Sequence, residues 1–298
     1  MSLAACLQKK SGYNGSVKRL KSAKAEKEMT MENIRLILAD IDGTLLNSSL
    51  EVTEITREAI GKLKKKNILF GIATGRSPYA VKRLVYEWGI GDDTALILGF
   101  NGSSVLDMRT GEITSVMRIS GKAIDAIRRD LQGYDYTIGM YEGETFIADR
   151  DINMARRIAE NNHFAFVLND FSEYRDREMG KLLVIAEKEE MDRIVAHYAK
   201  AQPSGLYHTF RSGGMLLECV NPGLSKSKGI ALLLERLNMK PEELMTFGDA
   251  MNDFDMIRDY VGVAMGNADE RVKAVASYVT LSNNEDGIGV FLNGHFGL

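Results

Sequence analysis

Residues 34–44 form an apolar run, broken only by Arg35, that ends in two carboxylates, Asp40 and Asp42, placed one residue apart. An apolar run without polar alternation is typical of a strand covered on both faces, as in a parallel sheet flanked by helices. Ligands of such sheets bind at the carboxyl ends of the strands. Two mutually repelling aspartates at that edge are suited to hold a divalent cation and to act as acid, base or nucleophile. Taken alone, the pair also fits a helix N-cap or a pair of loop aspartates. The choice between these and an active site depends on the other motifs of the chain.

Composition and charge restrict the function classes. Apolar residues make up 45% and charged residues 27% of the 298 residues, and no apolar run approaches the roughly 20 residues of a membrane-spanning helix. Cys6 and Cys219 are the two cysteines, without CxxC spacing, and the four histidines form no HxH or HExxH pattern. We therefore expect a soluble, cytoplasmic protein that uses no histidine chemistry and binds no membrane. The choice between a monomer and a weak homodimer stays open.

Residues 1–33 form a basic leader that we exclude from the predicted fold. They carry seven Lys or Arg against three Glu, which leaves residues 34–298 at a net charge of −7. Nucleic acid is not an expected partner for such an acidic body. A targeting arm at residues 17–25 is an open alternative, although the segment lacks a long apolar core and arginine richness.

Strands and helices are predicted to alternate up to residue 102. Helical spacing of apolar residues over 55–63, behind Thr53 as the candidate N-cap, predicts one helix, and Ser77-Pro78 predicts the capped start of a second. Further apolar runs end at Thr74-Gly75-Arg76 and at Asn101-Gly102. Right-handed crossovers make the strands parallel, so these polar breaks meet the two aspartates at one sheet edge.

The order changes after Ser104. Apolar stretches at 105–107 and 113–116 flank a turn and predict a hairpin. Residues 118–212 then mix helices and short strands, and alternating order returns with the run 216–220. The predicted class is therefore α/β: a doubly wound, mostly parallel, Rossmann-like core over 34–117 and 213–298, with an inserted α+β domain over 118–212.

Two more polar clusters follow the insertion. Lys226 stands in a loop before a predicted helix, where its ammonium can meet a phosphate at the helix N-terminus, although a solvated loop lysine is the commoner case. Gly248-Asp249-Ala250-Met251-Asn252-Asp253 ends another predicted strand with two carboxylates and an amide. Helix capping accounts for one of these side chains, but hardly for all three.

These segments, in this order, resemble the four motifs of the haloacid dehalogenase superfamily phosphatases: Asp40-Ile41-Asp42-Gly43-Thr44, Thr74-Gly75-Arg76, Lys226 and Gly248–Asp253. The resemblance covers nearly the whole chain beyond Met31. Asn101-Gly102, the large insertion, and the segments 265–268 and 282–287 are similar to the Cof-type subfamily, which has an α/β (type IIB) cap between the second and third motifs.

The resemblance implies a role for each motif residue. Asp40 is the implied nucleophile, which forms an aspartyl-phosphate, and Asp42 is the implied acid and base, oriented by Thr44. Thr74, Lys226 and nearby backbone amides, with Gly75 among the candidates, are implied to bind the transferring phosphoryl group, and Asn252 to position it or the lysine. These residue types fit because an anionic phosphate ester repels nucleophiles until its oxygens are neutralised.

Mg²⁺ is the implied cofactor, because it prefers hard oxygen ligands. Its implied ligands are Asp40, the Asp42 backbone carbonyl and Asp249, with Asp253 in a supporting position. Mn²⁺ accepts the same ligands and is an alternative.

The inserted domain is where we expect the leaving group to be recognised. Arg76 and Asn101 lie at the strand edge where a leaving group would sit, and a structural role fits each equally well. Lys181 and Arg211 are further candidates. Aromatic residues in the insertion fit the core of that domain better than a substrate wall: Tyr134, Tyr136, Tyr141 and Phe146.

Three functions follow from these patterns. The leading hypothesis is a magnesium-dependent phosphatase for small phosphorylated metabolites, such as sugar phosphates or a phosphorylated cofactor or its precursor. A phosphomutase on a sugar phosphate is the alternative within enzymes, and a non-catalytic sensor of phosphorylated metabolites is the alternative outside them. The presence of Asp40, Asp42, Lys226 and Asp249 argues against the sensor.

Overall fold

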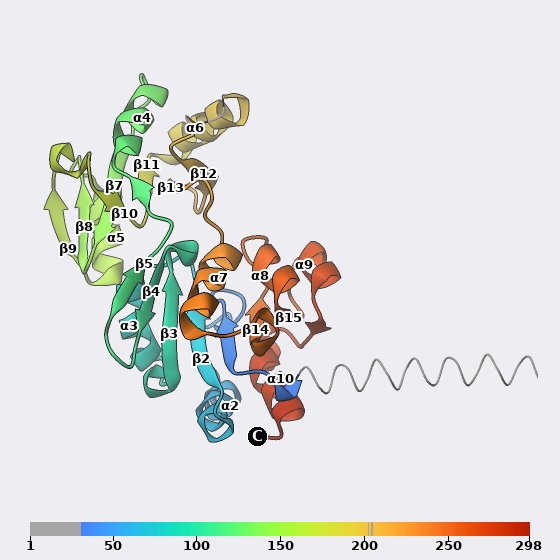
Figure 1. Cartoon of the computed structure of the whole chain (residues 1–298). Coiled ribbons are helices and arrows are strands. Elements are labelled where there is room, and N and C mark those ends of the chain that lie inside the picture. The colour runs from blue at the N-terminus through green and yellow to red at the C-terminus, as the bar shows by residue number, and fades with distance from the viewer. Residues whose placement is uncertain (1–30, 202, 204) are drawn as a thin grey trace, which may run out of the picture.

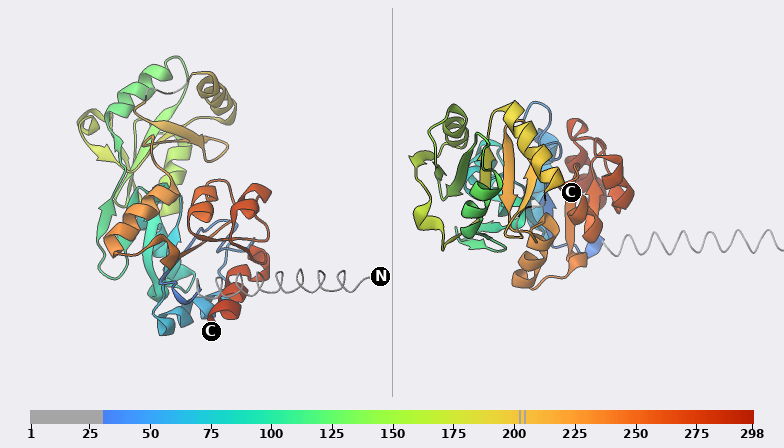
Figure 2. Two further views of the ribbon diagram at one scale, coloured as in Figure 1. Left: turned by 45° about the vertical axis from the view of Figure 1, so that its right-hand side comes forward. Right: turned by 90° about the horizontal axis from the view of Figure 1, so that it is seen from above.

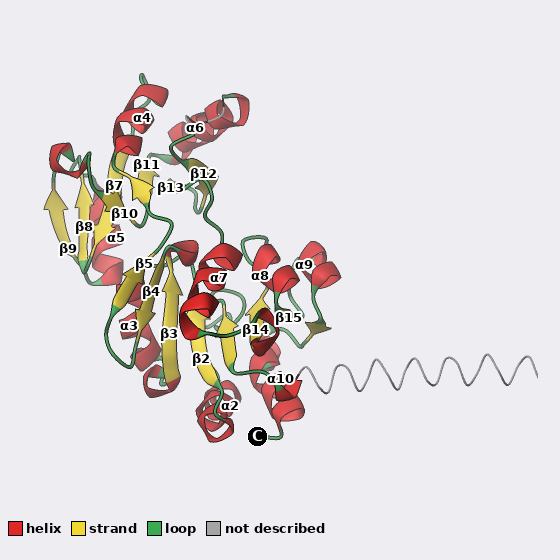
Figure 3. Cartoon of the chain, viewed as in Figure 1, coloured by secondary structure: helices red, strands yellow, loops and turns green. Residues whose placement is uncertain are grey.

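The computed structural model describes residues 31–201, 203 and 205–298 (Figure 1). The expectations about residues 1–30 lie outside the described residues. Figures 1 and 2 show two lobes: a core that holds the first and last parts of the described chain, and a cap built from its middle. In the core, helices flank the strands (Figure 3).

The core sheet is built around the strand that leads into the two aspartates. Its order in the described chain is β16-β15-β14-β1-β2-β3-β4-β5, parallel from β16 to β3. The strands are β1 (Leu36–Ala39), β2 (Leu69–Ala73), β3 (Thr94–Gly99), β4 (Ser104–Asp107), β5 (Ile113–Ser115), β14 (Leu244–Gly248), β15 (Val261–Ala264) and β16 (Tyr278–Val279). Every residue of β1 is buried, as the apolar run predicts. The antiparallel pairing of β4 and β5 confirms the predicted hairpin.

The predicted helices of the core are present. The core helices are α2 (Glu54–Leu63), α3 (Pro78–Glu87), α7 (Lys226–Leu237), α8 (Phe254–Asp259), α9 (Glu270–Val275) and α10 (Gly287–Phe296). Thr53 caps α2 as expected, because its Oγ1 accepts the N–H of Thr56 at 3.4 Å. Ser77 occupies the N-cap position of α3, but its hydroxyl makes no capping bond and is buried without a hydrogen-bond partner in the part of the chain that the structure describes. The predicted start of α3 is therefore right, whereas the side-chain cap is not formed.

The cap contains its own sheet with helices packed on it. Its elements are β6 (Ile119–Ser120), α4 (Lys122–Asp130), β7 (Thr137–Glu142), β8 (Thr145–Ala148), α5 (Asn153–Asn162), β9 (Ala165–Leu168), β10 (Glu178–Met179), β11 (Leu182–Ile185), α6 (Lys188–Lys200), β12 (His208–Arg211) and β13 (Leu216–Val220). The larger sheet has the order β12-β13-β11-β7-β8-β9. Phe146 is fully buried in an apolar cluster, and Tyr141 packs against it, which agrees with aromatic residues forming the core of this domain.

One strand lies in a different sheet from the one expected. β13, which we expected to resume the core sheet after residue 212, pairs antiparallel with β11 and β12 of the cap. The cap sheet thus extends to Val220, and the chain re-enters the core at α7. The physical reason is that β13 is an inner strand of the cap sheet with buried residues, so its apolar run looks like that of a core strand.

None of the helices in the described ranges combines the length and apolar character that crossing a bilayer requires.

Candidate active site

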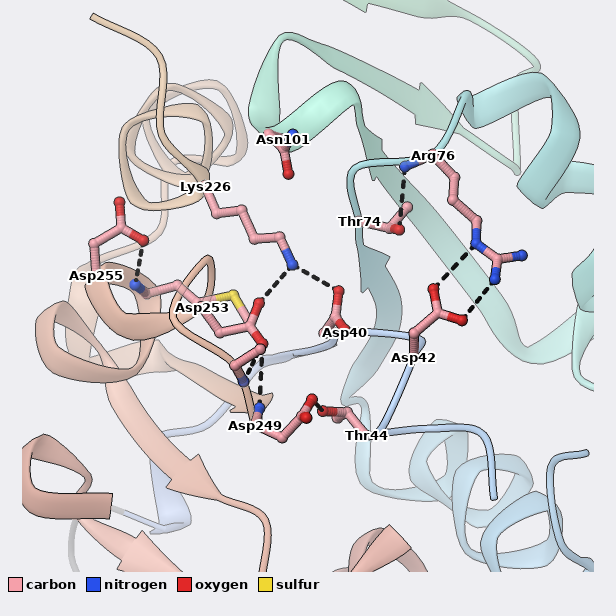
Figure 4. Close-up of polar contacts among 12 residues, drawn as sticks. Asp40, Asp42, Thr44, Thr74, Arg76, Asn101, Lys226, Asp249, Asp253 and Asp255 are labelled. Carbon is pink, nitrogen blue, oxygen red and sulfur yellow. Dashed lines mark hydrogen bonds and ion pairs between the residues drawn. The ribbon is translucent and has the colours of Figure 1, made fainter. Parts of the chain in front are cut away.

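The strand ends bring the separated motifs to one place (Figure 4). Asp40 directly follows β1, Thr74 follows β2, and Asp249 follows β14. Because β1 lies between the other two and all run parallel, their carboxyl ends share one edge. Lys226 is the first residue of α7, the helix that follows the cap in the sequence. Its side chain points to the same place as the strand-end residues.

Lys226 connects the first and last motifs. Its Nζ lies 2.6 Å from Oδ1 of Asp40 and 2.5 Å from Oδ1 of Asp253. All three residues are buried, and Lys226 is only 1% exposed. A buried ammonium of this kind needs carboxylate partners, so Lys226 is not the solvated loop lysine that its sequence context alone favours.

The electrostatics of the centre are those of crowded acids. Burial raises the pKa of Asp40, Lys226 lowers it, and the charges of Asp253 and Asp249 raise it further, so that it stands above its ordinary value. Burial works against the charged form of Lys226, but Asp253 and Asp40 raise its pKa above the ordinary value. The pKa of Asp249 is raised first by burial, against the lowering effect of its bond from Thr44. Lys226 is therefore held as a cation, and its single positive charge does not balance the negative charges of the surrounding carboxylates.

A divalent cation would supply the positive charge that the carboxylate cluster needs. Carboxylate oxygens of Asp40, Asp249 and Asp253 lie within 4.8 Å of one another, and Lys226 supplies one positive charge against the three carboxylates. Hard oxygen ligands in such a cluster are what Mg²⁺ binds. Asp253 uses Oδ2 to accept the N–H groups of Asp249 and Ala250 at 3.1 and 3.2 Å, so it also fixes the loop that carries Asp249.

The residues after Asp42 support the acidic cluster. Thr44, expected to orient Asp42, instead donates its hydroxyl to Oδ1 of Asp249 at 2.7 Å. Gly43 has φ +80°, and a Cβ at this position would lie 2.5 Å from Oδ2 of Asp249. Only glycine combines this backbone conformation with so close an approach.

Arg76 and Asp42 form a two-pronged ion pair beside the cluster. The side chain of Asp42 is more than half exposed, and it is not among the three carboxylates that converge in the described residues. Arg76, expected to contact phosphate or leaving group, here holds the carboxylate of Asp42. The backbone N–H of Arg76 also donates to Oγ1 of Thr74 at 3.2 Å.

The remaining candidates are divided between the site and the surface. Asn101 has φ +55° and donates its backbone N–H to the carbonyl of Thr74 at 2.9 Å, while its Nδ2 lies 3.5 Å from Oε2 of Glu218 in the cap. Asn252 is exposed, and among the described residues its side chain makes no hydrogen bond to Lys226 or Asp40. Arg211 lies at the end of β12 and binds Asp192 of the cap.

The contacts of three residues were not predicted from the sequence, although Asn267 and Asn283 lie in the segments 265–268 and 282–287 that carry the Cof-type resemblance. Asn267 donates to the carbonyl of Gly43 at 2.8 Å, and Asn283 donates to the carbonyl of Leu46 at 2.8 Å, so the C-terminal segments fix the loop after Asp40. Glu218 is buried at the boundary between cap and core, where it contacts Asn101. The signal for Glu218 was present in the sequence, because it is the one carboxylate inside the apolar run 216–220.

The doubly wound α/β core, with an acidic, lysine-bearing centre beneath an inserted domain, defines a capped enzyme built on a Rossmann-like sheet. The sequence profile of haloacid dehalogenase-like hydrolases matches residues 37–292, and this protein belongs to that family. Within it, the chain is a Cof-type phosphatase, as its relatives and its type IIB architecture show.

Three comparisons illustrate the match. The 5-amino-6-(5-phospho-D-ribitylamino)uracil phosphatase YitU of Bacillus subtilis is 27% identical, over 88% of this chain and 98% of YitU. A haloacid dehalogenase-like hydrolase from Bacteroides thetaiotaomicron superposes with a TM-score of 0.77 at 28% identity, over 88% of this chain and 99% of the other. The HAD subclass IIB sugar phosphatase BT4131 superposes with a TM-score of 0.70 at 26% identity, over 88% and 99%.

Proposed function

We propose that this protein is a magnesium-dependent phosphatase that hydrolyses small phosphorylated metabolites through an aspartyl-phosphate at Asp40. The single observation that carries the proposal is the position of Lys226, which lies against both Asp40 and Asp253 next to Asp249. In-line phosphoryl transfer requires a cation for the phosphoryl oxygens, a carboxylate nucleophile and carboxylates that can bind a divalent cation. Lys226, Asp40 and the cluster of Asp40, Asp249 and Asp253 supply these groups in contact with one another.

The side chains divide the work as follows. The Asp40 carboxylate attacks phosphorus, the phosphorus–oxygen bond to the leaving group breaks, and Asp42 gives a proton to the departing oxygen. Asp42 then takes a proton from the water that attacks the acyl-phosphate, which releases inorganic phosphate and restores Asp40. Lys226 and the hydroxyl of Thr74 hold the oxygens of the phosphoryl group meanwhile. Asp40, Asp249 and Asp253 would hold Mg²⁺, which neutralises phosphoryl oxygens when bound.

The proposed substrate class is supported by the names of two relatives. YitU and BT4131 are named for phosphate esters of small polar molecules, and BT4131 shares the fold of this chain. We include sugar phosphates and phosphorylated cofactor precursors in the proposal.

The test is phosphate release from a panel of phosphorylated metabolites, with Mg²⁺ and with EDTA, for wild type and Asp40→Asn. Release that needs both Mg²⁺ and Asp40 supports the proposal. Substrate loss without release of inorganic phosphate points to the mutase, and binding without any substrate loss points to the sensor.

A further inference from the structure

Lys181 and Glu218 form a buried ion pair at the boundary between cap and core. Nζ of Lys181 lies 2.9 Å from Oε1 of Glu218, and the two side chains are 5% and 8% exposed. Lys181 stands just before β11, and Glu218 lies in β13, its antiparallel neighbour. The pair lies outside the four motifs.

The ammonium of Lys181 is fully engaged by the protein. Besides Glu218, Nζ donates to the carbonyl of Gly75 in the core at 3.1 Å. The rings of Phe100 and Tyr141 flank it, with centroids at 5.6 and 5.7 Å. A lysine held by a carboxylate, a carbonyl and two aromatic faces is fixed in place, and its charge is compensated.

The carboxylate of Glu218, in contrast, retains accepting capacity. Oε1 binds Lys181, while among the described residues Oε2 accepts one hydrogen bond, from Nδ2 of Asn101 at 3.5 Å, the outer limit of such a bond. A carboxylate accepts about four hydrogen bonds. Glu218 is therefore the member of the pair that can bind a further donor.

Both partners contact the part of the core that flanks the phosphoryl site. Gly75 lies between Thr74 and Arg76, and Asn101 donates its backbone N–H to the carbonyl of Thr74. In Figure 4, Asn101 lies above the space between Lys226 and Thr74. Because Glu218 contacts Asn101, a leaving group that extends from the phosphoryl site past Asn101 toward the cap approaches Glu218.

We infer that Glu218 accepts a hydrogen bond from a hydroxyl or amino group of the leaving group, with Lys181 as its positioning residue. The pair selects phosphate monoesters whose leaving group offers a donor over esters whose leaving group carries an anion, because the weakly engaged Oε2 of Glu218 accepts a hydrogen bond and a carboxylate facing it has none to donate. This inference rests on the proposed phosphatase function and adds a specificity-determining residue to it.

The test compares two esters of similar size, glycerol 3-phosphate and 3-phosphoglycerate, in which a CH₂OH group becomes a carboxylate. We expect wild type to favour glycerol 3-phosphate in kcat/KM by about tenfold or more. Glu218→Gln keeps an acceptor but removes the charge, so the preference should fall by about fivefold or more. General destabilisation would lower both rates and leave this ratio unchanged.

Two further variants complete the design. Glu218→Gln leaves the buried Lys181 without a counter-charge, so Lys181→Met/Glu218→Gln, which removes both charges, serves as the second variant and should lower the preference in the same way. Glu189→Gln, an exposed charge loss on α6 of the cap, should keep the wild-type ratio.

The possible outcomes distinguish a failure of the Glu218 inference from a failure of the proposed phosphatase function. Phosphate release with no wild-type preference, or a ratio within about twofold of wild type in both Glu218 variants, overturns the inference alone. Absence of magnesium- and Asp40-dependent release from both esters and from p-nitrophenyl phosphate overturns the proposed function beneath it.

Discussion

Arg76 holds Asp42 by both carboxylate oxygens: Nη2 lies 2.6 Å from Oδ1, and Nε lies 3.2 Å from Oδ2. A guanidinium fork fixes the plane of a carboxylate as well as its position. The exposed fractions of the two side chains, 39% for Arg76 and 57% for Asp42, place the pair in contact with solvent. Arg76 is thus suited to aim the implied acid and base.

Arg76→Ala should lower kcat for p-nitrophenyl phosphate by about one to two orders of magnitude, because Asp42 loses its fixed aim. Stability should change by less than about 1 kcal/mol, since exposed ion pairs contribute little. Steady-state kinetics and thermal melting measure the two effects. Arg83→Ala, which breaks the exposed pair with Glu87 on α3, is the matched control and should keep kcat. Equal kcat values in the two variants would remove the aiming role.

Asp42→Asn should slow turnover by about two to four orders of magnitude, as expected for loss of a general acid and base. Phosphate binding should persist, because Asp42 is not among the converging carboxylates of the described cluster. Turnover assays and calorimetric titration with inorganic phosphate in Mg²⁺ measure the two quantities. Near-normal turnover would rule out the role of Asp42.

Lys226→Ala should abolish detectable turnover and destabilise the fold by about 3–5 kcal/mol, because Asp40 and Asp253 lose the cation that they both contact. Denaturant unfolding in EDTA measures the stability, and the phosphate-release assay measures turnover. Lys228→Ala removes an exposed lysine two positions along the same helix and should change neither quantity. Unchanged kcat/KM in Lys226→Ala would return Lys226 to a purely structural role.

Gly43→Ala should weaken Mg²⁺ binding by about tenfold or more, because its Cβ would collide with the Asp249 carboxylate. Calorimetric titration of Mg²⁺ measures the affinity directly. Gly111→Ala is the control, since Gly111 has a similar φ of +75° but no atom within 4 Å of the added Cβ. It should cost about 1 kcal/mol of stability and leave the affinity unchanged. Equal affinities in both variants would argue against Asp249 as a ligand.

The sequence predicted those features that depend on local pattern. The buried run before Asp40, the N-cap at Thr53 and the β4–β5 hairpin are each encoded within about ten residues, and the structure contains all three. The meeting of Asp40 and Asp249 was also predictable, because parallel strands share an edge, whereas Lys226, at the start of a helix, was placed with them only by the resemblance to the family.

Other features depend on partners far away in the chain. The run 216–220 shows that a buried strand exists, but not which sheet it joins, because pairing with β11 is decided by packing of the whole cap. In the same way, one hydroxyl at Thr44 can reach either Asp42 or Asp249, and only the folded position of Gly43 brings Asp249 within reach. The ion pairs of Arg76 with Asp42 and of Glu218 with Lys181 likewise join residues far apart in the sequence, so local pattern did not predict them.

The central place of β1 in the core sheet has a consequence for synthesis on the ribosome. One neighbour of β1 is β2, which follows soon after it, but the other is β14, which is made only after the whole cap. Until β14 emerges, a nascent chain exposes one side of β1 as an open edge, the kind of surface that favours aggregation. The core sheet is therefore completed only after the cap has been synthesised, and a truncated product that ends within the cap lacks both β14 and Lys226.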